Sequence, residues 1–354
     1  MRNDTRLCFT QYQDQLAKLS QVADTSVTFA VAPTVQQKLE DHIQESSDFL
    51  KRINIIGVDE LAGQKVGLGV SGTIAGRTDT SGNGVRVPRN VAALSEKGYE
   101  CKQTDYDTAI PYALLDAWAK FKDFQVRLRN AIIKRQALDR LVIGFNGKSA
   151  ADTTNREQNP LLEDVNIGWL QKYRVHAPER VMKEGKTSGK VVIGTGRTAD
   201  YNNLDALVYD AVSNLIDPWY RRDPGLVVIL GRELVHDKYF PLVNREQPAS
   251  EKLATDLILA QKRMGGLQPV EVPYCPPKGM LITSLENLSL YWQLGGRRRY
   301  MKEAPEKNRI ENYESSNDAY VVEDYGLGCL IENITHESEA ENDGEGGEDG
   351  EQPS

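Results

Sequence analysis

The sequence has little that would support a disulfide framework, a zinc site or a membrane anchor. Its four cysteines lie far apart without a CxxC pair, as expected for a protein kept in a reducing compartment. The best apolar candidate, Leu226–Leu230, has only the length of a strand, whereas a membrane-spanning helix needs about 20 apolar residues. Charged and polar residues interrupt the N-terminus, where a signal peptide needs an apolar core. We therefore expect a soluble protein, made in the cytoplasm, that contacts no membrane.

Motifs of catalysis and cofactor binding are also scarce. The four histidines form no HxxxH or HxH pair, and the chain has neither a GxSxG elbow nor a GxxxxGK phosphate loop. Gly67, Gly69 and Gly72 match a dinucleotide-binding pattern, but glycines and prolines follow them instead of the helix that such a site requires. These absences predict a protein that is not an enzyme and carries no cofactor.

A second glycine pattern leaves an enzymatic alternative open. Gly194, Gly196 and Ala199 follow a strand-like segment and precede a predicted helix, which is the order found around bound phosphates. The chain lacks the organisation of a parallel sheet, so a loop before a capped helix is the favoured interpretation. A nucleotide-binding enzyme built on this loop is the alternative, and it predicts a nucleotide-dependent rise in melting temperature.

Charge is unevenly distributed along the 354 residues. The formal net charge is −8, but residues 332–354 hold nine acidic residues and no lysine or arginine. The rest of the chain, with 42 acidic and 43 basic residues, is close to neutral. Residues 335–354 are therefore predicted to be a disordered acidic tail.

The N-terminal region predicts two amphipathic helices. Apolar side chains recur at helical spacing, first at Phe9, Tyr12, Leu16, Leu19 and Ala23, and again at Val35, Leu39 and Ile43. Residues 24–33 between them are small, β-branched and almost uncharged. Two short helices joined by a pliable segment indicate an arm.

A change of period after the arm predicts a long β-hairpin. Apolar side chains alternate through Val66, Leu68 and Val70, and alternation returns through Tyr99, Cys101 and Gln103. Residues 72–89 between these strands are rich in glycine, serine, threonine and asparagine, which predicts a polar tip. A connection of this length is commonly either functional or disordered.

Residues 114–145 keep a helical rhythm of apolar side chains, which predicts a single helix about 45 Å long. Its other face is basic, with Lys120, Lys122, Arg127, Arg129, Lys134, Arg135 and Arg140 against Asp123 and Asp139. Among these, Arg127, Arg129, Lys134 and Arg135 are the candidates for contact with DNA or with a partner. Aromatic residues suited to base stacking are not interleaved with these basic residues, so sequence-specific recognition of nucleic acid is not expected. A non-specific DNA-binding protein is a further alternative.

The remaining sequence mixes helix and strand patterns without a βαβ series or an internal repeat. A helix is predicted over Leu204–Leu215, and strands over Leu226–Leu230, 270–272, 280–283, 288–292, 319–324 and 329–334. The fold class is therefore α+β. Because arms and hairpins bury surface only when they lie across neighbours, an assembly of many copies is expected.

Several sequence blocks resemble the major capsid proteins of P-two-type (Peduovirus) tailed phages. They are QESSDFLKRIN (44–54), FQVRLRNAIIKRQ (124–136), GWLQKYR (168–174), YFPLVN (239–244), LITSLENLSLY (281–291), ENYES (311–315) and YVVEDY (320–325). The blocks extend from the second predicted helix to the last predicted strands.

The resemblance implies a Hong Kong 97-like capsid fold with seven segments. Residues 1–30 would be an N-terminal assembly segment, 31–56 an N-arm and 57–107 an E-loop hairpin. Residues 108–200 would form a P-domain with a long spine helix, 201–308 an A-domain, 309–334 the return strands of the P-domain, and 335–354 the acidic tail.

The resemblance also implies a function. The chain would assemble with copies of itself, as hexamers and pentamers, and with a scaffolding protein into an icosahedral procapsid in the host cytoplasm. A maturation protease would remove the N-terminal segment, by position near Phe29 and Ala30, before the shell expands. A portal protein and packaged double-stranded DNA are further expected partners within the virion. The E-loop tip at Ser81, Gly82, Asn83 and Gly84 would change conformation between the procapsid and the expanded shell.

Overall fold

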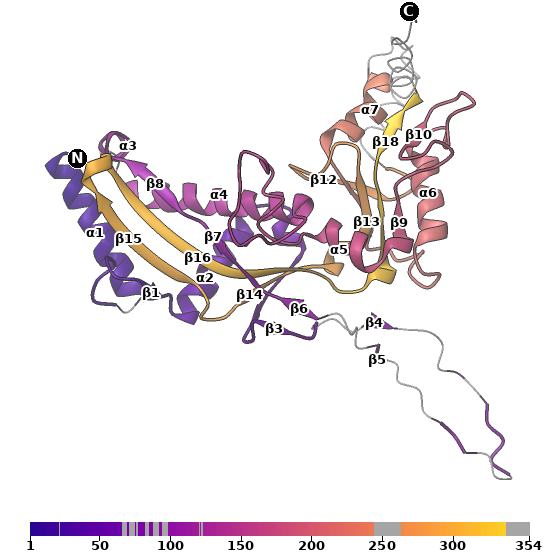
Figure 1. Ribbon diagram of the computed structural model, residues 1–354, viewed down its shortest axis with the longest axis horizontal. Helices are drawn as coiled ribbons and strands as arrows, with labels where there is room; N and C mark the ends of the chain where they lie inside the picture. Colours follow the sequence, from indigo (N-terminus) through magenta and orange to yellow (C-terminus); the bar gives the residue numbers. More distant parts are fainter. Residues whose placement is uncertain are drawn as a thin grey trace, which may run out of the picture.

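Two β-sheets organise the chain. The computed structural model describes residues 1–337 apart from residues 21, 66–68, 71–74, 76, 82–84, 88–91, 94–97, 120, 122 and 244–262. A long sheet runs along the molecule, and a second sheet lies at the end away from the N-terminus (Figure 1). The combination confirms the α+β prediction.

The long sheet is built around one long central strand. Its seven strands are β1 (Phe29–Ala30), β2 (Asn54–Val58), β7 (Lys102–Asp105), β8 (Thr108–Pro111), β14 (Leu288–Gln293), β15 (Arg298–Ala304) and β16 (Arg309–Val322). The order is β1-β15-β16-β14-β2, and β7 and β8 also pair with β16. At Asp318, β16 has Trp292 of β14 on one edge and Lys102 of β7 on the other. Strands β14 and β15, within residues 201–308, therefore belong to this sheet.

The second sheet is mixed and has the order β12-β11-β13-β17-β9. Its strands are β9 (Val181–Met182), β11 (Leu226–Leu230), β12 (Gln268–Glu271), β13 (Met280–Ser284) and β17 (Gly328–Ile331), and a separate parallel pair joins β10 (Val191–Ile193) to β18 (Ile334–His336). Every residue of β11 is buried, which confirms the strand predicted from its continuous apolar run.

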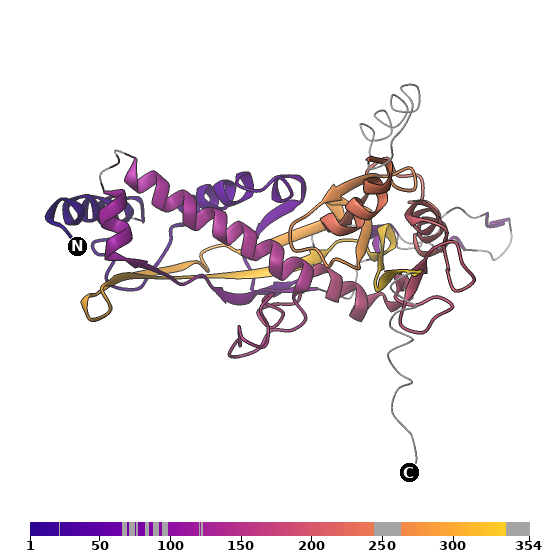
Figure 2. The ribbon, with the colours of Figure 1, turned by 90° about the horizontal axis from the view of Figure 1, so that it is seen from above.

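The α-helices are α1 (Asn3–Ser20), α2 (Pro33–Glu45), α3 (Tyr112–Trp118), α4 (Phe124–Asn146), α5 (Trp169–His176), α6 (Leu204–Leu215) and α7 (Arg232–Val243). Short 3₁₀ turns cover Leu50–Arg52, Pro178–Arg180, Leu285–Asn287, Pro305–Lys307 and Tyr325–Leu327. Helix α4 runs lengthwise across the long sheet (Figure 2). No helix within the described ranges is both long and apolar enough to span a lipid bilayer.

The prediction of one continuous helix over residues 114–145 is wrong. The helix is interrupted between Trp118 and Phe124, although no proline or glycine lies there. Packing supplies the reason, because Leu115 of α3 and Leu128 of α4 are both buried in the same apolar cluster. In one straight helix these two positions would point about 140° apart. The interruption lets both face the cluster, so tertiary contacts outweigh local propensity.

The predicted hairpin is present in the described residues as two antiparallel ladders. β3 (Ala62–Gly63) pairs with β6 (Tyr99–Glu100), and further out β4 (Gly69–Val70) pairs with β5 (Ala92–Ala93). The outer pair lies away from both sheets (Figure 1). Of the predicted tip, Ser81 is exposed and its backbone N–H donates to Asp79. Gly82, Asn83 and Gly84 lie outside the described residues, as do residues 338–354 of the predicted tail.

Candidate functional site

The candidate processing residues Phe29 and Ala30 form the edge strand β1. Phe29 lies opposite Arg299 of β15 and Ala30 opposite Arg298, and the Val31 N–H donates to the Arg297 carbonyl at 3.0 Å. The Phe29 side chain is buried. Residues 29 and 30 are therefore held more firmly than the expected pliable segment.

Helix α1 is packed against the far end of the long sheet. Phe9 and Tyr12 are buried in one cluster with Ile110, Leu115, Leu128, Met301 and Ile310. The Arg6 guanidinium donates to both carboxylate oxygens of Glu303, at 2.9 and 3.2 Å. Leu19, predicted to lie on the apolar stripe, is exposed, whereas its neighbour Ser20 is buried. Thus α1 covers apolar surface that α3, α4, β8, β15 and β16 provide.

Replacing Phe9 with alanine is expected to weaken the docking of α1 by about 3 kcal/mol, because the ring leaves a cavity in the cluster. Faster hydrogen exchange of the α1 amides would report the loss. The matched control is Leu7→Ala, whose side chain is 65% exposed and whose loss should change stability by less than about 0.5 kcal/mol. Equal acceleration in both variants would contradict the packing role of Phe9.

A fully buried network of charges joins α2, α4 and the long sheet. Arg140 of α4 donates to Glu40 of α2 at 2.5 and 3.2 Å, and its guanidinium lies 3.2 Å from Asp318 of β16. Arg297 donates to Glu40 at 2.7 Å and to Glu314 of β16 at 2.8 Å. These five side chains are each no more than 3% exposed. Gln136 and Tyr106 complete the network through bonds to Glu314 and Asp318.

The electrostatics of this network favour its ionised form. Burial alone would raise the pKa of Glu314, but the positive charges of Arg297 and Arg299 outweigh it and lower the pKa to about 2. Burial likewise disfavours the Arg140 cation, yet Asp318 and Glu40 raise its pKa well above the ordinary value. Because each charge has a buried partner, removing one partner leaves an uncompensated charge in the interior.

The structure separates the residues of the predicted basic helix face. Arg129 and Lys134 are exposed. Arg127 pairs with Asp123 at 2.8 Å, with its guanidinium 4.7 Å from the Phe121 ring centroid, and Arg135 pairs with Asp139 at 2.5 Å. Placing Arg140 on this solvated face is wrong, because its charge is neutralised inside the protein. Helical spacing could have shown that Arg140 lies on the buried face, because it follows buried Ile133 and Ala137 by seven and three positions.

The two glycine patterns lie in different settings. Gly69 belongs to β4, whereas Gly67 and Gly72 fall outside the described residues. Gly194 and Gly196 follow strand β10, and α6 begins only at Leu204. The Gly196 N–H and the Thr198 hydroxyl both donate to the carboxylate of Glu337. A group of this same chain thus occupies the loop.

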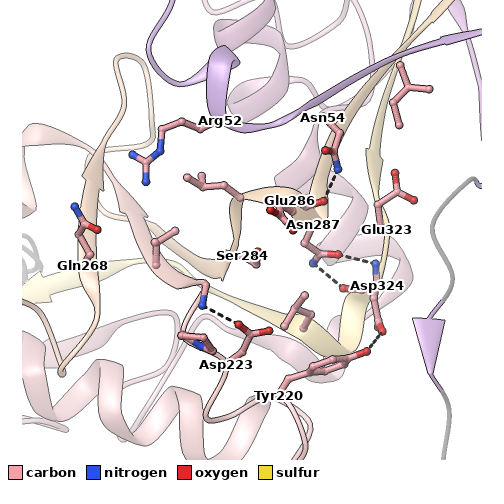
Figure 3. A pocket seen from close by; sticks show the side chains of 16 residues that line it. Arg52, Asn54, Tyr220, Asp223, Gln268, Ser284, Glu286, Asn287, Glu323 and Asp324 are labelled. Carbon is pink, nitrogen blue, oxygen red and sulfur yellow. Dashed lines mark hydrogen bonds between the residues drawn. The ribbon is translucent and has the colours of Figure 1, made fainter.

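A cavity of about 840 Å³ lies where the two sheets meet (Figure 3). Several of its polar groups pair with one another. The Asn54 amide donates to the Glu286 carbonyl at 2.6 Å. The Asn287 side-chain amide donates to the backbone carbonyl of Asp324 and accepts from its backbone N–H, both at 2.7 Å, and the Tyr220 hydroxyl donates to the Asp324 carboxylate at 2.9 Å. These hydrogen bonds hold together the segments that meet between the two sheets. Across the part of the chain that the structure describes, no three His, Cys, Asp or Glu side chains are placed to hold a metal ion.

Comparison with protein families decides between the alternatives. The family model described as phage major capsid protein, P2 family, matches residues 8–334. The chain belongs to the P2 family of phage major capsid proteins.

Relatives of this capsid protein match along nearly its whole length. A chain described as capsid proteins of Escherichia phage P2 is 53% identical over 341 residues, covering 94% of this chain and 95% of the relative. The major capsid protein of Serratia phage KSP20 is 44% identical over 344 residues, covering 95% and 98%. The resemblance read from the sequence blocks is therefore confirmed, and the capsid protein is not an enzyme.

Solved structures confirm the Hong Kong 97-like fold. A chain of the satellite phage P4 procapsid, which includes the size determination (Sid) protein, superimposes with a TM-score of 0.80 at 50% identity, covering 95% of this chain and 99% of that one. The capsid of an empty GTA particle gives a TM-score of 0.50 at 13% identity, covering 82% and 90%, a likeness of fold alone. This capsid protein forms the procapsid shell by self-assembly and is a component of the virion.

Proposed function

We propose that the capsid protein assembles in the host cytoplasm, as hexamers and pentamers, with a scaffolding protein and a portal protein. A maturation protease then removes residues 1 to about 30 by a cut near Phe29 and Ala30. The shell expands afterwards and encloses the double-stranded DNA genome of a tailed phage.

The placement of β1 is the observation that carries the processing step. Its two residues connect a helix that covers apolar surface, α1, to a helix anchored by buried charges, α2. A cut there would separate α1 from the anchored body while leaving α2 in place. Because β1 is hydrogen-bonded to β15 and Phe29 is buried, cleavage requires a local opening of this edge.

We assign roles to the remaining segments from the resemblance to Hong Kong 97-like capsid proteins. Residues 31–56 act as the N-arm, 57–107 as the E-loop, and 108–200 with 309–334 as the P-domain around α4. Residues 201–308 act as the A-domain, except that β14 and β15 pair within the long sheet and move with the P-domain. Residues 335–354 act as an acidic tail. For the packaged DNA, exposed Arg129 and Lys134 offer non-specific phosphate contacts.

The decisive experiment is co-expression of the chain with a candidate scaffolding protein and protease. Sedimented material is imaged by negative-stain electron microscopy, and the subunits are weighed by mass spectrometry. We expect closed, uniform shells whose subunits begin close to Ala30. Mature particles that retain Met1 would contradict the processing step, whereas a failure to form shells with any scaffold would contradict the assembly step.

Deleting residues 81–86 is expected to leave a folded subunit that forms defective shells. The described residues of this stretch, Ser81, Val85 and Arg86, are exposed, so the subunit core does not depend on their side chains. Circular dichroism would check the fold and electron microscopy the particles. Normal, stable particles would contradict the role of the hairpin as an E-loop that contacts neighbours.

A further inference from the structure

The loop after β10 and the root of the acidic tail lie side by side for a topological reason. Strands β10 and β18 are parallel, and their register places Val191 opposite Ile334 and Ile193 opposite His336. The residues that follow the two strands, Gly194 and Glu337, therefore emerge at the same edge of this pair. Glu337 directly precedes the region with the highest density of acidic residues in the chain.

Both oxygens of the Glu337 carboxylate are bound by the loop. The Gly196 N–H donates to Oε2 at 2.8 Å, and the Thr198 hydroxyl donates to Oε1 at 2.8 Å. The pKa of Glu337 is lowered, first by the Gly196 bond, then by the Thr198 hydroxyl, with smaller help from the backbone N–H groups of Thr195 and Thr198. Several donors thus converge on one oxyanion.

The two glycines of the loop are explained by the carboxylate and not by backbone conformation. Neither Gly194 nor Gly196 is among the described glycines with a positive φ, so another residue type would be free of backbone strain. A Cβ at position 194 would lie 2.4 Å from Oε2 of Glu337, and one at position 196 would lie 2.0 Å from Oε1. A Cβ at either position would therefore displace the carboxylate from its present place on the loop.

We propose that the loop of residues 194–198 is an oxyanion-binding site whose resident ligand is the Glu337 carboxylate of the same chain. The site fastens the root of the acidic tail to the parallel strand pair. It accepts another oxyanion, carboxylate or phosphate, only when Glu337 is removed, because a tethered ligand has a high effective concentration. This inference does not depend on the processing or expansion steps proposed above.

The first test measures the bond that the site makes. In Glu337→Ala, hydrogen–deuterium exchange of the full-length protein should show the Gly196 amide exchanging about tenfold faster or more, because it loses a charge-assisted bond. The matched control is Glu339→Gln, which removes a tail charge two residues further on and should leave that amide unchanged. Thr198→Val, which keeps the side-chain shape but lacks the hydroxyl, should give a smaller acceleration. Unchanged exchange in Glu337→Ala, or equal acceleration in Glu339→Gln, would overturn the proposal.

The second test asks whether the vacated loop binds an oxyanion. Inorganic phosphate and acetate are compared with chloride at equal ionic strength, and the melting temperature is followed. We expect a saturable rise in Glu337→Ala, none in the wild type, and none in the double variant Glu337→Ala/Gly196→Ala, whose added Cβ fills the site. A rise with phosphate alone identifies phosphate as the acceptable class, and a rise with both identifies oxyanions in general. Equal shifts in all three proteins, or no shift in any, would overturn the proposal.

Discussion

Replacing Arg140 with methionine is expected to lower the free energy of unfolding by about 3–5 kcal/mol. Methionine fills similar space, but it leaves Asp318, which is 1% exposed, without its charged partner and leaves Glu40 with Arg297 alone. Glu40 and Glu314 would then share Arg297, and Asp318 would keep only neutral donors such as the Tyr106 hydroxyl. Urea denaturation of the purified subunit, analysed for its midpoint and slope, measures the change.

Arg135→Met is the matched control for this substitution. Arg135 lies on the same helix, and its ion pair with Asp139 is formed by a side chain that is 58% exposed. The partner carboxylate of Asp139 is 22% exposed, so it stays in contact with water after the substitution. This variant should lose only about 1 kcal/mol, much less than Arg140→Met. If the free energy of unfolding fell equally in both variants, the loss would be a general effect of substitutions in helix α4. It would then not come from the buried network.

Replacing Trp169 with alanine is expected to lower the free energy of unfolding by about 4–5 kcal/mol. Trp169 is fully buried, with ring centroids 5.1 Å from Tyr320 and 5.4 Å from Phe145. Its indole N–H donates to the Ser289 carbonyl at 3.0 Å. Alanine would leave a cavity at the junction of α4, α5 and the long sheet and would remove the partner of a buried carbonyl. Equilibrium denaturation again measures the change.

Trp219→Ala provides the control for the loss of an indole. The Trp219 side chain is 53% exposed, so its removal should cost less than about 1 kcal/mol. The close fit at Trp169 also predicts that Gly144→Ala is destabilising, since the added Cβ would lie 2.2 Å from the indole ring. A Trp169→Ala variant as stable as Trp219→Ala would contradict the central place of this ring in the core.

The sequence by itself determined the elements whose signals are local. The continuous apolar run of β11, the amphipathic stripes of α1, α2 and α6, and the alternation of the hairpin each reflect a period of a few residues. These periods follow from the geometry of a helix or a strand, so they can be read before any long-range contact is known. The sequence blocks also indicated the family, and the family implied the capsid fold.

Only the tertiary structure decided which of those local patterns were overridden. It interrupted the expected long helix so that Leu115 and Leu128 could share one cluster, and it paired residues 29 and 30 with β15. The folded structure also places Arg140 in the interior, where its partner Glu40 lies 100 positions away along the chain. In the glycine loop, the Gly196 N–H binds the carboxylate of Glu337. Such contacts depend on surfaces that exist only after distant segments have packed. The helical spacing of a charged residue can indicate the face on which it lies, but only the folded structure shows which carboxylate neutralises it.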